Sequence, residues 1–414
     1  MKLSRYNLHV SNDSTVLVYN TRTGNYALIP KDIFNDFNAM GFDADTLSKF
    51  ESLGFYVSKD LDEFSSIQEE CNRRTRGNKI RKLRILTTTG CNAKCPYCYE
   101  KGVKHSFLTN EVAKGIVSFL TSEIESGDKI RIEWFGGEPL LNVNAIDYIS
   151  NQVKENLPND CDFASNIVTN GFLITPHIIE KMKNVWNLKQ VQITLDGIGK
   201  DYEKVKMLGK DSFEKVIDNI RLLIENQINV DIRVNFDSHN LKQVEDLLSY
   251  LSALPYGHKL NVYPAKIFSD ETKKGYFDLE EESILVNELF RKYGFRKGEK
   301  LLPRSFHTSC MASYPNFYTI SPTGKIFKCD RQFLDIDAIA DVKDSPVSSQ
   351  LTEYVKSNDN IAEKCQKCVL YPLCWGGCYY DRENGLYPCY LSSKIVLSSM
   401  KMALEDMTKK DTED

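Results

Sequence analysis

Three cysteines on a short stretch of chain are the first residues whose types and spacing could do chemistry. Cys91, Cys95 and Cys98 follow the spacing C-x3-C-x2-C. Cysteines this close together usually hold a metal. A closed structural zinc site needs four ligands, whereas a [4Fe–4S] cluster held by three cysteines leaves one iron with an open position. The spacing favours such a cluster; the alternatives are a zinc site with a remote fourth ligand and a chance grouping.

A second group of cysteines lies in the last quarter of the chain. They follow the spacing C-x13-G-x4-C, then C-x2-C-x5-C-x3-C, then one more cysteine: Cys310, Cys329, Cys365, Cys368, Cys374, Cys378 and Cys389. From spacing alone, zinc ribbons and iron–sulfur clusters explain this pattern equally well. Cys71 and Cys161 have no close cysteine neighbour, so we expect both to be small buried or half-buried apolar residues.

The composition carries no membrane or nucleic-acid signature. Of the 414 residues, 42% are apolar and 27% are charged, and the formal net charge is −4. That charge argues against a nucleic-acid partner. The N-terminus, MKLSRYNLHV, lacks the apolar core of a signal peptide, and no apolar run is long enough to span a bilayer. We therefore expect a cytoplasmic protein with no membrane partner, whose reduced thiols are free to bind metal.

The elements that must position these cysteines fall into three segments, which we predict as domains 1–78, 79–299 and 300–414. In the second segment, strands alternate with helices, which indicates βαβ units on a parallel sheet. The predicted strands are Leu83–Leu86, Ile130–Trp134, Ser165–Val168, Val191–Leu195, Asp231–Asn235 and Leu260–Tyr263. The clearest helix runs from Ser212 to Gln227, and Thr175 followed by Pro176 predicts the start of another. Periodicity alone does not choose between a partial barrel and an open sheet.

Polar motifs follow the predicted strands in order. The cysteine loop comes after the first strand, and the others are Gly136-Gly137-Glu138-Pro139, Thr169-Asn170-Gly171, Thr194-Leu195-Asp196-Gly197, and Arg233 with Asn235. Together with Tyr97, the aromatic residue before the last cysteine of the loop, they resemble the radical S-adenosylmethionine (SAM) superfamily. The resemblance implies an α/β fold with a partial (β/α)6 barrel, whose chemistry lies at the C-terminal ends of its strands.

The same resemblance implies the cofactors and the reaction. The open iron of a [4Fe–4S] cluster would bind SAM, the GGEP motif would meet its methionine amino group, and the later motifs would contact its ribose and carboxylate. One electron, from a reductant such as flavodoxin or ferredoxin, would cleave SAM to a 5′-deoxyadenosyl radical that abstracts a hydrogen atom from the substrate. The cofactors perform the difficult step, and the protein positions them and excludes water.

The late cysteines resemble the SPASM extension of radical SAM enzymes that act on peptides and proteins. This resemblance implies two auxiliary [4Fe–4S] clusters, and therefore three clusters in all. The outer one would be held by Cys365, Cys368, Cys374 and Cys389, and the inner one by Cys310, Cys329 and Cys378. Because no eighth cysteine lies between Cys310 and Cys329 or shortly before Cys310, we hypothesise that the inner cluster has an open iron.

One acidic residue beside these cysteines is a candidate for catalysis. Asp330 directly follows Cys329, where sulfatase-maturing relatives carry an aspartate that acts as a base. Arg331 next to it is expected to keep the carboxylate ionised. The alternative is a solvated or ion-paired surface pair.

The first segment is expected to recognise a peptide. Its strands, Tyr6–Val10, Val16–Tyr19 and Tyr26–Ile29, precede two short helices, Lys31–Met40 and Ala44–Leu53, and Asp60–Asn78 reads as a helix or a linker. This order resembles the winged-helix-like elements of enzymes that modify ribosomal peptides, which bind a leader peptide as an added edge strand. The alternative is a cap that only packs on the barrel.

These observations predict a radical SAM maturase of a ribosomally synthesised precursor peptide, bound through its leader. Thioether formation, carbon–carbon crosslinking and epimerisation all remain open. A second candidate is oxidation of Cys or Ser in a sulfatase to formylglycine. A candidate of another class is a non-catalytic, zinc-stabilised peptide-binding scaffold.

Overall fold

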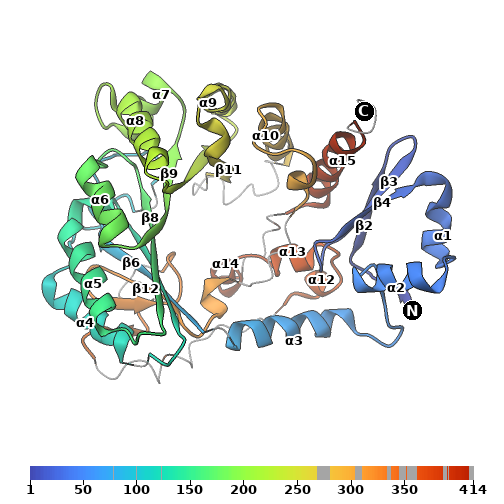
Figure 1. Cartoon of the computed structure of the whole chain (residues 1–414), viewed down its shortest axis with the longest axis horizontal. Coiled ribbons are helices and arrows are strands. Elements are labelled where there is room, and N and C mark those ends of the chain that lie inside the picture. The colour runs from blue at the N-terminus through green and yellow to red at the C-terminus, as the bar shows by residue number, and fades with distance from the viewer. Residues whose placement is uncertain are drawn as a thin grey trace. The chain divides into compact units, whose positions relative to one another are not determined.

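The computed structural model describes residues 1–77, 79–98, 100–122, 124–267, 280–303, 310–332, 337–344, 351, 361–385, 389 and 391–409 (Figure 1). The chain divides into two units. The first comprises Met1–Gly77, Glu271–Cys310 and Ser357–Asp414, and the second comprises Asn78–Asp270 and Met311–Lys356. The three consecutive domains expected from the sequence stay a prediction. Within the described ranges, no helix combines the length and apolar character needed to cross a membrane.

A parallel sheet forms the centre of the second unit. Its strands β6 (Ile80–Thr88), β7 (Lys129–Gly136), β8 (Asp162–Thr169), β9 (Leu188–Leu195), β10 (Asn229–Phe236) and β11 (Asn261–Lys266) lie side by side in chain order, and each runs parallel to its neighbour. All six predicted strands are confirmed, the last with bounds slightly shifted. Among the described strands β11 pairs only with β10, so the sheet stays open there, as a partial barrel requires.

Three short strands extend this sheet beyond β6. β12 (Phe317–Ile320) pairs in parallel with β6, and β13 (Lys325–Phe327) and β14 (Ala340–Asp341) follow in antiparallel order. They come from the segment that contains Cys329. The sheet therefore places that cysteine, which follows β13, on the same body as the cysteine loop after β6.

Helices connect the parallel strands. They are α4 (Asn110–Thr121), α5 (Val143–Asn156), α6 (Pro176–Asn184), α7 (Gly199–Lys206), α8 (Ser212–Glu225) and α9 (Leu241–Ala253), and Figure 1 shows α4, α5 and α6 stacked along one side of the sheet. Helix α8 buries the predicted apolar face, including Phe213, Val216 and Ile220. The predicted start of α6 is confirmed, because the Thr175 side chain accepts a hydrogen bond from the Ile178 amide.

The first unit combines both ends of the chain. β2 (Asn7–Ser11), β3 (Thr15–Asn20) and β4 (Tyr26–Pro30) form an antiparallel sheet, β1 (Lys2–Leu3) pairs with β5 (Tyr56–Val57), and α1 (Phe34–Ala39), α2 (Ala44–Ser52) and α3 (Glu63–Arg76) complete the N-terminal part. The predicted strand-then-helix order is confirmed, and α3 shows that the polar stretch before residue 78 is a helix. The assignment of this part as a winged-helix-like peptide-recognition domain stays a prediction.

The C-terminal helix shares a core with the N-terminal sheet. Helix α15 (Ser393–Lys409) packs Val396, Met400 and Leu404 into one apolar cluster with Leu17 and Tyr19 of β3. The unit also contains α10 (Glu280–Lys292) and the short helices α12 (Glu363–Gln366), α13 (Tyr371–Cys374) and α14 (Tyr379–Glu383). Burying each large apolar side chain contributes about 1.5–3 kcal/mol, so the N-terminal sheet depends on distant parts of the chain for its stability.

Two glycines allow the end of β7 to pack directly against the loop that follows β6. A Cβ atom on Gly136 would lie 2.1 Å from the Thr88 carbonyl oxygen, and one on Gly137 would lie 2.3 Å from the Gly90 carbonyl oxygen. Gly136 also has a φ of +113°, which side chains disfavour. The amides of Gly137 and Glu138 donate hydrogen bonds to Thr88 and Gly90, at 3.0 and 2.9 Å. Only glycine fits at both positions.

The Glu138 carboxylate ties the end of β7 to the end of β8. Its side chain is fully buried and accepts hydrogen bonds from the Leu140 amide (3.0 Å), the Thr169 hydroxyl (2.7 Å) and the Asn170 amide (2.8 Å). Two of these donors are buried backbone N–H groups, which need an acceptor within the protein because they cannot bind water there. Glu138 therefore fixes the backbone immediately after β8.

We predict that Glu138→Gln destabilises the second unit by about 1–3 kcal/mol. A glutamine amide presents N–H hydrogens where one carboxylate oxygen now accepts, so at least one buried amide loses its acceptor. The free energy of unfolding in urea and the hydrogen exchange of the Asn170 amide measure this effect. The matched control is Glu180→Gln on the exposed face of α6. Equal stabilities and equal Asn170 exchange in the two variants would contradict the role of Glu138.

Candidate SAM and iron–sulfur site

The three cysteines of the first motif lie together on the loop after β6. All three are half-buried, and the Ala93 amide donates to Cys91 Sγ at 3.3 Å. Burial raises the pKa of Cys91 to about 11, and the negative charges of Glu138, Cys95 and Cys98 act in the same direction. Thiolates that raise one another's pKa need a cation to stay deprotonated, so this donor set fits an iron–sulfur cluster.

Glu100 is a residue beside this loop that the sequence reasoning missed. Its side chain is buried, and neither carboxylate oxygen has a hydrogen-bond partner among the described residues. Burial raises the pKa of Glu100 to about 7. A buried acceptor without a donor is uncommon in proteins. Its position close to Cys98 fits a ligand that carries hydrogen-bond donors, as the amino group of SAM does.

The predicted residues after β8 contact the cysteine loop. Asn170 Nδ2 donates to Asn92 Oδ1 at 2.7 Å and lies 4.0 Å from Cys91 Sγ. The Thr169 hydroxyl is turned toward Glu138. The GGEP motif and the TNG motif thus meet the loop in one place, and Asn92 joins them although no sequence motif marks it.

Of the residues predicted at the end of β9, Thr194 lies on the strand and Asp196 forms a buried ion pair. Thr194 is half-buried on the strand. Asp196 is buried and forms an ion pair with Lys206 of α7, with 2.7 Å between Oδ2 and Nζ. Lys206 in turn donates to the Tyr97 hydroxyl at 3.4 Å. Tyr97, the aromatic residue of the cysteine motif, and Asp196, a predicted SAM contact, are therefore linked through a lysine that sequence reasoning missed.

The polar side chains of β10 line a polar face of the sheet. Arg233 Nε donates to Asn235 Oδ1 at 3.0 Å, and Tyr263 of β11 donates to Gln192 of β9 at 2.7 Å. Burial raises the pKa of Tyr263, the Arg233 charge opposes this, and Glu133 of β7 adds to it. The registers of neighbouring strands place Glu133, Gln192, Arg233 and Tyr263 on one face of the sheet.

Asp330 also joins this polar face. Arg84 of β6 donates to Asp330 and, at 2.5 Å, to Glu133, and its guanidinium lies 4.7 Å from the centre of the Phe135 ring. The sequence suggested Arg331 as the cation that keeps Asp330 ionised. Among the described contacts, Arg84 is a cation that touches its carboxylate, which no local pattern could reveal; the role of Arg331 stays a prediction.

Four of the late cysteines are brought together in the first unit. Burial raises the pKa of Cys374, and the charges of Cys368, Cys365 and Cys389 add to the shift. Burial likewise raises the pKa of Cys365, with contributions from Cys389 and Cys368. These are the four residues predicted to hold the outer auxiliary cluster.

The three cysteines predicted for the inner cluster are divided between the units. Cys310 is exposed and Cys378 precedes α14, both in the first unit, whereas Cys329 is buried in the second. The two remaining cysteines behave as expected for apolar residues, because Cys71 is buried and Cys161 is half-buried.

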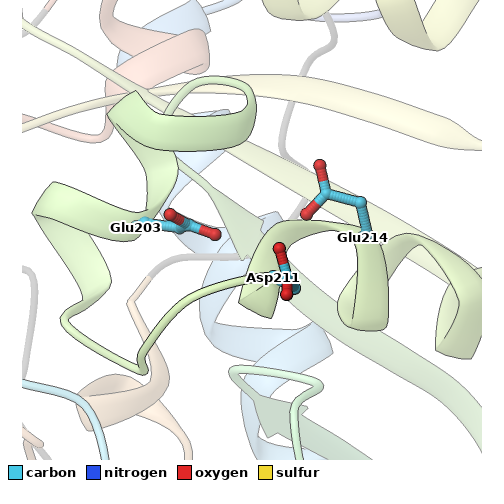
Figure 2. Close-up of side chains that lie close together, drawn as sticks. All are labelled: Glu203, Asp211 and Glu214. Carbon is cyan, nitrogen blue, oxygen red and sulfur yellow. The ribbon is translucent and has the colours of Figure 1, made fainter.

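A separate acidic group lies on α7, on α8 and on the residue that directly precedes α8. The carboxylates of Glu203, Asp211 and Glu214 have ligand atoms within 4.8 Å of one another (Figure 2). Asp211 and Glu214 are exposed to solvent. Exposed acidic residues often cluster without an ion, so we assign no metal to this group.

Comparison with known proteins agrees with the arrangement of the cysteine loop and the strand ends. The family model of the radical SAM superfamily matches residues 85–251. The chain is 24% identical over 388 residues to the radical SAM cyclopropyl synthase TigE of Paramaledivibacter caminithermalis, covering 84% of this chain and 79% of TigE. It is 30% identical over 236 residues to the probable GTP 3′,8-cyclase of Methanocaldococcus jannaschii, covering 56% of this chain and 71% of that protein.

A solved structure shares the fold. Native anSMEcpe with bound AdoMet and the Kp18Cys peptide superimposes with a TM-score of 0.61, at 20% identity, over 80% of this chain and 98% of that chain. The expected mixed α/β fold with a partial parallel sheet is thereby confirmed, and the alternative of a non-catalytic zinc scaffold is wrong, because the relatives are enzymes. This chain belongs to the radical SAM superfamily and is an enzyme of that superfamily.

Proposed function

We propose that this enzyme modifies a ribosomally synthesised peptide by radical SAM chemistry and holds three [4Fe–4S] clusters. The observation that carries the proposal is the second set of four thiols, Cys365, Cys368, Cys374 and Cys389, which influence one another's pKa. Such a set, in the SPASM-like spacing, accompanies radical SAM enzymes that act on peptides and proteins. A soluble reductant such as flavodoxin or ferredoxin would supply the electron.

The residues of the second unit have separate tasks in this proposal. Cys91, Cys95 and Cys98 hold the cluster that binds SAM. Bound together, this cluster and SAM supply the one-electron cleavage that yields a 5′-deoxyadenosyl radical. Gly136 and Gly137 allow the backbone after β7 to pack against the cysteine loop, and Glu138 holds the Thr169 hydroxyl and the Asn170 amide in place. The polar face around Arg233 and Tyr263 would hold the substrate.

Substrate recognition is assigned to the N-terminal part of the first unit. Among the described strands, β4 pairs only with β3, so its outer edge offers main-chain donors and acceptors. An extended leader peptide adds to such an edge as a further strand. Tyr26 and Leu28 of β4 are exposed apolar residues that would contact its side chains.

Hydrogen abstraction from a peptide can lead to several kinds of product. Thioether formation, carbon–carbon crosslinking and epimerisation are all compatible with hydrogen abstraction from a peptide. The similarity to a cyclopropyl synthase adds cyclopropane formation as a form of carbon–carbon bonding. A second candidate, oxidation of a sulfatase Cys or Ser to formylglycine, is favoured by the position of Asp330 beside Arg84 on the polar face.

Iron analysis separates the proposed clusters from one another. We predict about twelve irons per chain after anaerobic reconstitution, as three [4Fe–4S] clusters require. Replacing Cys91, Cys95 and Cys98 with alanine should remove about four irons and all SAM cleavage. Replacing Cys365 and Cys368 should also remove about four irons, while 5′-deoxyadenosine still forms. Iron and sulfide content together with chromatography of the nucleoside give these values.

The control for the iron analysis is Cys161→Ala, a half-buried cysteine outside both groups. It should retain all iron and all SAM cleavage. Zinc in place of iron, or iron only at the first cysteine group, would contradict the proposal of auxiliary clusters.

A sulfatase-derived peptide with a cysteine at the modified position distinguishes the two candidate functions. We predict that the enzyme makes no formylglycine from it, as shown by mass spectrometry of the peptide. If formylglycine forms, the second candidate is right, and Asp330→Asn should then slow its formation by about 10²–10⁴-fold, the usual contribution of a general base. Asp344→Asn, on an exposed residue after β14, is the control.

A further inference from the structure

A buried ion pair lies beside the cysteine loop and is not explained by the fold. Lys206 and Asp196 are both buried, with 2.7 Å between Lys206 Nζ and Asp196 Oδ2. Removing two charges from water has a large free-energy cost, and well-packed apolar residues would stabilise the protein as well or better. Stability alone therefore does not account for the buried pair, so we expect it to have a role at the neighbouring cysteine loop.

Lys206 holds the cysteine loop through both its backbone and its side chain. Its carbonyl oxygen accepts a hydrogen bond from the Lys94 amide at 2.9 Å. Its Nζ donates to the Tyr97 hydroxyl at 3.4 Å and lies 6.0 Å from the centre of the Tyr97 ring. Lys94 and Tyr97 flank Cys95 in the sequence, so α7 fixes the stretch of loop from which two of the three thiols extend.

Lys206 keeps its positive charge although its side chain is buried. Burial tends to lower the pKa of Lys206, but the charge of Asp196, followed by Tyr97 and Cys95, raises it well above its usual value. Because Lys206 is paired with Asp196 and contacts Lys94 and Tyr97 on either side of Cys95, its positive charge lies next to the part of the loop that carries two proposed cluster ligands.

The charges of the pair act on the loop with opposite sign. Electrostatic interactions are strong in a dry interior, and the reduction potential of an iron–sulfur cluster depends on the net charge around it. Reduction adds one electron from an external donor, breaks no bond and makes the cluster more negative. A nearby cation favours this change, and a nearby carboxylate opposes it.

We propose that Lys206 is a positioning residue that raises the reduction potential of the cluster held by Cys91, Cys95 and Cys98, and that Asp196 limits this effect. The inference rests on the proposed function, because it needs that cluster. It gives Asp196 a task as the counter-charge of Lys206 in place of the direct SAM contact expected from the sequence. It also explains why Tyr97, the aromatic residue of the motif, lies beside a buried lysine.

The test is the reduction potential of the cluster in the reconstituted full-length enzyme. Potentials are measured before SAM is added, by redox titration followed by electron paramagnetic resonance, and the relevant signal is the one that later changes on adding SAM. We expect Lys206→Met to shift the potential to more negative values and Asp196→Asn to shift it to more positive values. The double variant should lie between the two, and Lys206→Arg should stay close to the unmodified enzyme.

The controls separate charge from structure. Lys204→Met replaces an exposed lysine on the same helix and should leave the potential unchanged. If Lys206→Met fails to take up iron, two other variants still test the inference. Asp196→Asn should have a more positive potential, and Lys206→Arg should keep the potential of the unmodified enzyme. Shifts in the same direction for Lys206→Met and Asp196→Asn, or an unchanged potential in Asp196→Asn, would overturn the inference.

Failure of this inference differs from failure of the proposed function. If the unmodified enzyme takes up no cluster at the first cysteine group and leaves SAM intact, the proposed function fails. If it takes up the cluster and cleaves SAM while the potential ignores Lys206 and Asp196, only the present inference fails.

Discussion

The close backbone contact between the end of β7 and the loop after β6 is the constraint on which the rest of the site depends. It exists because Gly136 and Gly137 have no side chains, since a Cβ atom on either would collide with a carbonyl oxygen of residues 88–90. The contact holds the cysteine loop at the C-terminal end of β6 and leaves the Glu138 side chain buried. This side chain accepts hydrogen bonds from Thr169 and Asn170 of the β8 end, so the ends of three neighbouring strands are tied together.

Buried charges complete this arrangement and are costly to fold. Glu138, Asp196 and Lys206 are all removed from water, and each is matched by hydrogen bonds or by an opposite charge. Networks of this kind rigidify a site when every member is satisfied. Glu100 departs from the pattern, because its carboxylate has no partner within the described chain. Glu138, Asp196 and Lys206 therefore form a fixed frame, and the Glu100 carboxylate is suited to a ligand with hydrogen-bond donors.

The sequence predicted those parts of the fold that follow local rules. The alternation of strand and helix patterns along the segment located all six parallel strands, and the Thr175-Pro176 signal located the start of α6. Pairings between distant residues could not be predicted. Arg84 and Asp330 are 246 positions apart, and Lys206 reads as an ordinary surface lysine at the end of a helix until the fold buries it. The shared core of α15 and β3 was missed for the same reason, since periodicity identifies an apolar face but not what covers it.

Anomalous diffraction at the iron edge, from crystals of the anaerobically reconstituted enzyme with SAM, tests the central claim most directly. We expect one cluster of irons bound to Cys91, Cys95 and Cys98 with SAM beside it, and another bound to Cys365, Cys368, Cys374 and Cys389. Cys329 should contact a third cluster. Iron at the first group alone, or zinc at the late cysteines, would contradict the assignment of this enzyme to the peptide-modifying members of its superfamily.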